Sequence, residues 1–169
     1  MSHFYDHSLP VFTKGLKALS IILHKAEDHA KANNIPLNDF FTAALTDDMK
    51  PLPFQVFVAT NTALKALARA SFVAPPEQEQ SDTTFEDLYT RVDETLAALE
   101  KADPAVLAAN DGKTFKAPLG PQEFEFTAAS YVARFALPNY FFHLVTAYDI
   151  LRAKGVPIGK MDYLVSFVQ

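Results

Sequence analysis

Residues 128–154 read AASYVARFALPNYFFHLVTAYDILRAK, and this stretch decides the fold class. Apolar side chains recur in it every three or four residues, which is the spacing of one face of an α-helix. That apolar stripe consists of Leu137, Phe141, Leu144, Tyr148 and Leu151. We therefore predict one long helix over residues 128–154, kinked at Pro138 and ended by Gly155.

Three earlier segments show the same periodicity. The first predicted helix runs from Ser8 to the Asn33-Asn34 pair, and the second covers residues 51–71. The third runs to about Ala102 and begins at Thr83, which forms a capping box with Glu86.

Residues 113–127 alternate apolar and polar side chains around Pro118-Leu119-Gly120-Pro121, which predicts a β-hairpin. A lone hairpin is marginally stable unless its apolar face packs on something, so we expect it to lie against the helices. The predicted fold is all-α: an antiparallel four-helix bundle with a small β-hairpin before the last long helix, in a single domain of residues 1–169.

Composition excludes several classes of function. The chain of 169 residues has no cysteine, which excludes disulfides, thiolate metal sites and a cysteine nucleophile. Its formal charge of −5 gives no broad basic surface, so no nucleic-acid partner is expected. No apolar stretch approaches the roughly 20 residues that a membrane span needs, so we expect no membrane partner and a cytoplasmic location.

A line of polar side chains runs beside the apolar stripe of the last predicted helix. Asn139, His143 and Thr146 follow one another at i, i+4 and i+7. A buried polar group costs about 1–3 kcal/mol when it is unpaired, so these groups should face a polar cavity or a partner on a neighbouring helix. A buried histidine satisfied by that neighbour is the simpler alternative.

The second predicted helix carries a matching line, in which small residues leave space between polar ones. This line consists of Gln55, Ala59, Thr62, Ala66 and Arg69. Close helix–helix packing would favour the same alanines, so the line fits either a cavity or a tight contact. Asp48, one turn upstream, either caps this helix or reaches the same cavity.

The candidate catalytic residues are therefore His143, Asn139, Gln55, Asp48 and Thr146. A neutral imidazole at His143 would act as general acid or base, because its pKa lies near physiological pH. Asn139 and Gln55 would orient a carbonyl or phenol by hydrogen bonds, with assistance from Asp48. Phenylalanine and tyrosine rings around them would hold an apolar or aromatic substrate.

The order of residues also resembles a known family. The string from Phe135 to Tyr148, FALPNYFFHLVTAY, and the segment Asp48-Met49…Pro51-Leu52…Gln55-Val56 are similar to an uncharacterised domain-of-unknown-function family within the DinB/YfiT-like metalloenzyme superfamily. The resemblance covers nearly the whole chain. It implies a four-helix bundle that is often dimeric.

The superfamily resemblance also implies a divalent metal held by three histidines, one on the second helix and two spaced i, i+4 on the fourth, and in some members a thiol transferase activity. Here His143 is similar to one ligand, but residue 147 is Ala, residue 139 is Asn and the second-helix counterpart is Gln55. His143 is thus the one plausible metal ligand, and a histidine with amide and hydroxyl neighbours suits zinc or nickel poorly. Whether any cofactor binds stays open.

Three functions remain open at this point. The first is a small enzyme without a tightly bound metal, which would use His143 for isomerisation, dehydration or group transfer. The second is a non-catalytic module that binds a small-molecule ligand or forms a homodimer through a helix face. The third is a degenerate metal-dependent transferase or hydrolase.

Overall fold

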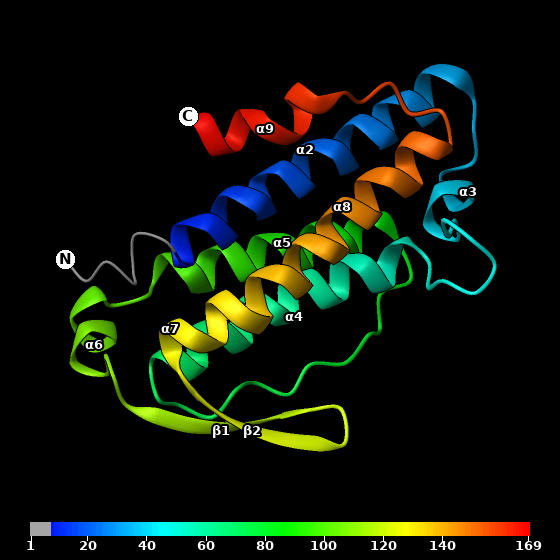
Figure 1. Ribbon diagram of the computed structural model, residues 1–169. Helices are drawn as coiled ribbons and strands as arrows, with labels where there is room; N and C mark the ends of the chain where they lie inside the picture. The colour runs from blue at the N-terminus through cyan, green and yellow to red at the C-terminus, as the bar shows by residue number, and fades with distance from the viewer. Residues whose placement is uncertain (1–7) are drawn as a thin grey trace.

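Four long helices dominate the computed structural model, which describes residues 8–169. They are α2 (Leu9–Asn33), α4 (Leu52–Ala70), α5 (Phe85–Glu100) and α8 (Leu137–Ala153), and they lie side by side (Figure 1). The shorter elements are α3 (Leu37–Phe41), α6 (Pro104–Ala109), β1 (Thr114–Leu119), β2 (Gln122–Thr127), α7 (Ala128–Tyr131), η1 (Val132–Ala136) and α9 (Lys160–Val168). The chain is mostly helical with one small antiparallel hairpin, as predicted.

The order of the long helices is not a simple up-and-down sequence. In Figure 1, α4 and α5 run in the same direction, while α2 and α8 run the opposite way. Residues 71–84 make this order possible, because they carry the chain back along the length of α4 without regular structure. A helix of 19 residues is about 28 Å long, and 14 extended residues span up to about 46 Å.

A single cluster of buried apolar side chains joins the long helices. It draws on every long helix and continues to Ile158 beyond α8. The fully buried Tyr140 of α8 donates its hydroxyl to the backbone oxygen of Phe12 in α2, at 2.8 Å. Gly15 makes this contact possible, because a Cβ at that position would lie 2.5 Å from the Tyr140 hydroxyl oxygen.

The last long helix is interrupted near its start. We predicted one helix over residues 128–154 with a kink at Pro138, but α7 is followed by a π-helical turn, η1, before α8 begins. Pro138 has no N–H to donate to the carbonyl four residues earlier. The preceding N–H, that of Leu137, bonds the oxygen of Val132 five residues back, which widens the turn. Gly155 follows the end of α8 at φ 90°, as its predicted role requires.

The start of α5 is capped one residue later than predicted. The capping box pairs Thr84 with Asp87 rather than Thr83 with Glu86. The Asp87 carboxylate accepts hydrogen bonds from the backbone N–H groups of both Thr83 and Thr84, at 2.8 and 2.9 Å. These bonds lower the pKa of Asp87 to about 2, so the carboxylate stays ionised at physiological pH.

The hairpin packs against the helices, as expected, and the C-terminal helix packs on α2. Ala117 and Phe126 turn inward from the hairpin and are buried. Helix α9 lies along α2, where the Lys14 ammonium donates to the backbone oxygen of Phe167 and Lys25 pairs with Asp162 at 2.6 Å. Among residues 8–169, no helix has both the length and the apolar character needed to cross a membrane.

Candidate functional site between α4 and α8

The imidazole of His143 in α8 is bonded to Gln55 in α4. Its Nδ1 lies 2.7 Å from the side-chain oxygen of Gln55. The Gln55 amide nitrogen in turn donates to the backbone oxygen of Lys50 at 2.7 Å, so its oxygen is the atom that faces the ring. An oxygen acceptor at Nδ1 requires the hydrogen on that nitrogen, which leaves Nε2 with the lone pair in the neutral ring.

The surroundings of His143 keep the ring neutral. Burial lowers the pKa of His143 below its ordinary value, because the charged imidazolium loses hydration. The ring is half-buried and stands edge-on to Phe142 and close to Phe54, with ring centres 5.1 and 5.9 Å away. A neutral imidazole held in one orientation among aromatic rings is suited to accept a proton or a hydrogen bond at Nε2.

Two further polar contacts continue the line along α4. The Asn139 amide donates to the Thr62 hydroxyl at 2.9 Å. Two turns beyond Thr62 in α4, the Arg69 guanidinium hydrogen-bonds the hydroxyl of Tyr131 in α7. It also lies over the Tyr131 ring, 4.5 Å from the ring centre. We call these two contacts and the Gln55–His143 bond, three polar contacts in all, the α4–α8 seam.

Tyr131 was not among the sequence candidates. Eight residues separate it from Asn139, and a regular helix would place the two about 80° apart. The π-helical turn between them shifts the phase, so that both reach α4. The polar line predicted for the second helix already contained Arg69. That arginine was the one sign in the sequence that a further polar partner, here Tyr131, would face this helix.

Two of the five candidates do not join this site. Asp48 is exposed, and its carboxylate accepts a hydrogen bond from the Thr46 hydroxyl at 2.5 Å within its own turn. Thr146 is buried, but its hydroxyl donates to the Phe142 backbone oxygen of its own helix at 2.6 Å. The structure thus brings together His143, Gln55 and Asn139, and leaves Asp48 and Thr146 in local bonds.

The most pronounced cavities among the described residues lie elsewhere. Five stand out, and none of them is lined by His143, Asn139 or Gln55. The largest, about 640 Å³, opens between α5 and the connection formed by residues 71–84. Sequence analysis did not anticipate it, because this connection shows no periodicity and its key contact, Arg91 with Asp82, is not a recognisable motif.

The residues of the seam differ from the three-histidine metal site that the superfamily resemblance implies. The described residues contain no group of three His, Asp or Glu side chains placed to bind one ion. Position 147, where a second α8 ligand would stand, is a fully buried alanine. Both side-chain polar atoms of Gln55 already form hydrogen bonds, the nitrogen with the Lys50 backbone oxygen and the oxygen with His143 Nδ1. These residues do not fit that metal site.

The comparisons with known proteins agree with the fold. Residues 4–164 match the family described as Domain of unknown function (DUF1993), and the chain belongs to this family. A solved structure of a DinB family member protein from Shewanella denitrificans is similar to this chain, with 32% identity and a TM-score of 0.85. That similarity covers 95% of this chain and 90% of the other. No curated protein matches the chain.

Proposed function

We propose that this protein binds a small apolar or aromatic molecule on the solvent-facing side of the α4–α8 seam, where His143 and Asn139 are only half-buried, and uses His143 as a general acid and base. The observation that supports the proposal is the chain of two hydrogen bonds from His143 through Gln55 to the Lys50 backbone oxygen. It fixes the tautomer and directs basicity to Nε2.

In this proposal each residue of the seam has a distinct role. Nε2 of His143 takes a proton from the substrate, and the Gln55 side-chain oxygen stabilises the resulting imidazolium by accepting a hydrogen bond from Nδ1–H. Asn139 has its nitrogen on Thr62, so its oxygen is available to a phenol or enol hydroxyl. Returning this proton to a different substrate atom completes an isomerisation. Delivering it to a departing hydroxyl completes a dehydration, with water as the leaving group. In a group transfer, the acceptor gives up the proton as it forms the new bond, and the proton passes to the leaving group.

The test is a titration of ¹⁵N-labelled protein with phenol and with benzaldehyde, followed by NMR of the His143 ring and the Gln55 amide. Shifts confined to the seam, lost in His143→Gln and kept in His29→Gln, would support the proposal. His29 is the matched control, because it lies on α2 and bonds Asn33 of its own helix. Shifts that persist in His143→Gln, or none with either probe, would refute binding at this site.

A second measurement identifies the natural ligand. Native mass spectrometry of the purified chain should show a bound mass that His143→Gln loses while its helical circular dichroism stays unchanged. A variant that instead unfolds would assign His143 a purely structural role. Elemental analysis of the same sample checks the metal-dependent alternative, which a stoichiometric divalent ion retained through purification would revive.

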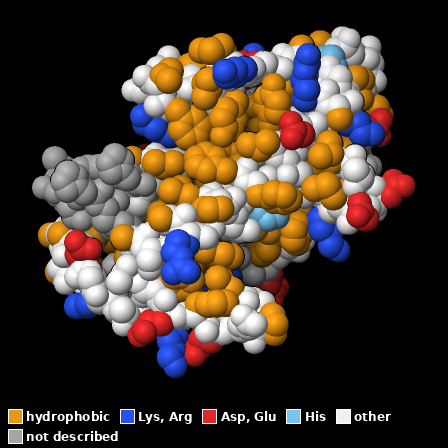
Figure 2. Space-filling view, viewed as in Figure 1, with side chains coloured by type: hydrophobic (Ala, Val, Ile, Leu, Met, Phe, Trp, Pro, Cys, Tyr) orange, Lys and Arg blue, Asp and Glu red, His pale blue; other side chains and the backbone are white. Residues whose placement is uncertain are grey.

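A second candidate function is a non-catalytic module that forms a homodimer. Helices α8 and α9 expose several apolar side chains, including Phe142 at 58% and Met161 at 64% exposure. Figure 2 shows a broad hydrophobic area over the side of the molecule where α9, α2 and α8 lie. Contiguous apolar surface of this kind marks interaction sites in proteins. A second copy of the single bundle domain would cover it.

Sedimentation equilibrium tests this candidate. Phe142→Glu should convert a dimer to a monomer, because it places a charge at an exposed apolar position of α8. Phe124→Glu is the matched control, since Phe124 is an exposed phenylalanine in the hairpin. An unaltered chain that sediments as a monomer, or a dimer insensitive to Phe142→Glu, would exclude this interface.

A further inference from the structure

We propose that a second copy of this chain closes the open side of the His143 site, by packing its α8 antiparallel against this α8 about Val145. This inference rests on the His143 site proposed above, and it gives the apolar face of α8 and α9 a role in that site. His143 and Asn139 are half-buried, and neither lines any of the five cavities that stand out among the described residues. Small-molecule sites enclose most of their ligand, so the seam needs a further wall.

The exposed side of α8 begins directly beside His143. The Phe142 ring stands edge-on to the imidazole, with ring centres 5.1 Å apart, and more than half of the Phe142 side chain is exposed. Val145 follows three residues later and is also exposed, and Asp149 follows after four more. Spacings of three and four keep Phe142, Val145 and Asp149 on one side of the helix. A body that covers this side therefore stands next to the imidazole.

This side of α8 carries a projection and a hollow, one on each side of Val145. The projection is Phe142, about 4.5 Å before Val145 along the helix axis. The hollow opens just after Val145, between α8 and α9. Its volume of about 250 Å³ exceeds the roughly 150 Å³ that holds a benzene molecule. The hollow is lined by Val145, Tyr148, Asp149, Lys160 and Tyr163.

A projection and a hollow at similar distances from one residue suit a two-fold contact. Both copies present the same surface in such a contact, so each projection needs its receptor on that same surface. With the two α8 helices antiparallel and the axis at Val145, Phe142 of each copy lies opposite residues 148 and 149 of the other. Phe142 then enters the hollow beside the rings of Tyr148 and Tyr163, where a further aromatic ring packs favourably.

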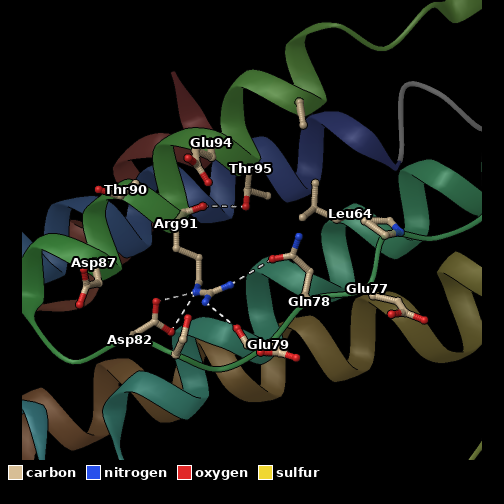
Figure 3. Close-up of a pocket in the computed structure, with 13 residues that line it drawn as sticks. Leu64, Glu77, Gln78, Glu79, Asp82, Asp87, Thr90, Arg91, Glu94 and Thr95 are labelled. Carbon is tan, nitrogen blue, oxygen red and sulfur yellow. Dashed lines mark hydrogen bonds and ion pairs between the residues drawn. The ribbon is translucent and has the colours of Figure 1, made fainter.

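The charges of the hollow are balanced. It contains one acid, Asp149, and one base, Lys160, and neither has an ion-pair partner in the described part of the chain. Two copies that meet here therefore do not repel. The 640 Å³ cavity beside α5 lacks this balance: Figure 3 shows Arg91 bonded to Asp82 there, and the other charged side chains of its lining are all acidic. Two copies would repel at that surface.

Helix α9 extends the apolar face beyond α8. Most of its side chains are apolar, yet none of its residues is fully buried. A helix that is apolar on more than one side is normally covered on more than one side, and α9 packs mainly on α2. The hydrophobic area in Figure 2 includes this uncovered side. Because the hollow lies between α8 and α9, a second copy seated in it contacts both helices.

Disulfide cross-linking tests the contact without any ligand. The chain has no cysteine, so a single introduced cysteine reports on its own position. Val145→Cys places a thiol on the proposed axis, where the two copies of this residue come within reach of a disulfide. Oxidation with copper phenanthroline at micromolar protein concentration should link most of this variant into a dimer.

Val106→Cys is the matched control, because Val145 and Val106 are 39% and 42% exposed and Val106 lies in α6. It should cross-link at least about tenfold more slowly, since no symmetric contact brings its two copies together. Equal cross-linking of the two variants, or none of Val145→Cys, overturns the proposal.

Phenol binding then separates this inference from the His143 site itself. Val145→Glu opposes two carboxylates on the axis and should give a monomer in sedimentation, whereas Val106→Glu should not. Both positions are exposed, so helical circular dichroism should stay unchanged in both. NMR titration of the His143 ring should show phenol binding at least about fivefold weaker in Val145→Glu than in Val106→Glu, because the monomer lacks the second wall.

The outcomes distinguish the two proposals. A Val145→Glu variant that remains a dimer, or a monomeric one that binds phenol as tightly as Val106→Glu, overturns the shared wall and leaves the His143 site standing. The absence of phenol binding in the cross-linked Val145→Cys dimer, where the wall is held in place, refutes the His143 site and this inference with it.

Discussion

Helix α4 has two faces that meet very different surroundings. Toward α8 it packs directly, since Ala59, Ala63 and Ala66 are buried and let the helices approach, and polar side chains bond across the contact. Toward the connection of residues 71–84 it meets an irregular segment, and a groove remains. Two regular helices can match small side chains along their length, whereas an extended connection held at one arginine cannot fill the space beneath it.

Truncating a leucine on each side of α4 should give the largest difference between these regions. Leu144→Ala in the packed contact should lower the free energy of unfolding by about 4 kcal/mol, because it leaves a cavity at a fully buried site. Leu64→Ala, at the half-buried wall of the groove, should cost about 1 kcal/mol because space already exists there. Urea denaturation measures both. Equal losses would mean that the groove is not open in solution.

The ion pair that holds the connection should give the next largest effect. Arg91→Met leaves the Asp82 carboxylate buried without its partner and should cost about 3 kcal/mol. The Arg91→Met substitution should also increase the rate of amide hydrogen exchange more in residues 76–82 than in α8.

Arg91→Met/Asp82→Leu is the control for this prediction, because it removes both charges and should recover most of the loss. A single variant as stable as the unaltered chain would show that the pair does not fix the roof of the groove.

The smallest effect should come from the titration of His143 in the seam. Its folded pKa lies below its unfolded value, so the unfolded chain binds more protons between the two values. The contribution to stability is therefore complete above the unfolded pKa of about 6.5, and falls as the pH drops toward the folded pKa.

Chemical denaturation at a series of pH values should show this slope in the unaltered chain and a shallower one in His143→Gln. An identical pH dependence in His143→Gln would contradict the burial-driven pKa shift. Such a result would also leave the proposed base without its main electrostatic feature.

The long helices were more predictable from the sequence than the points where they begin or are interrupted. The long helices and the hairpin follow from periodicity, which a short window of residues contains. The cap of α5 was misplaced by one residue because Thr83 and Thr84 are both followed by an acid three residues later, and only the geometry of the preceding chain chooses between them. The π-helical turn was missed because Pro138 predicts a disruption without predicting its form.

The candidate site was partly predictable for a similar reason. The polar lines on the second and last helices were visible as lines, and the structure joins Gln55 to His143 and Thr62 to Asn139. Asp48 and Thr146 satisfy the same sequence criteria but find partners within their own segments. Such short-range hydrogen bonds use the polar groups that a site would need. The spacing of residues along a helix does not reveal which polar groups will form them.

The sequence by itself determined which segments are helical and which helix faces carry polar groups, because those properties depend on neighbours within a few residues. Tertiary structure alone decided that Gln55 meets His143 across 88 residues of chain, and that a groove opens where Arg91 reaches Asp82. Such pairings depend on the distance that a connection spans and on the contacts that hold it in place. Neither can be inferred from the spacing of residues within one helix.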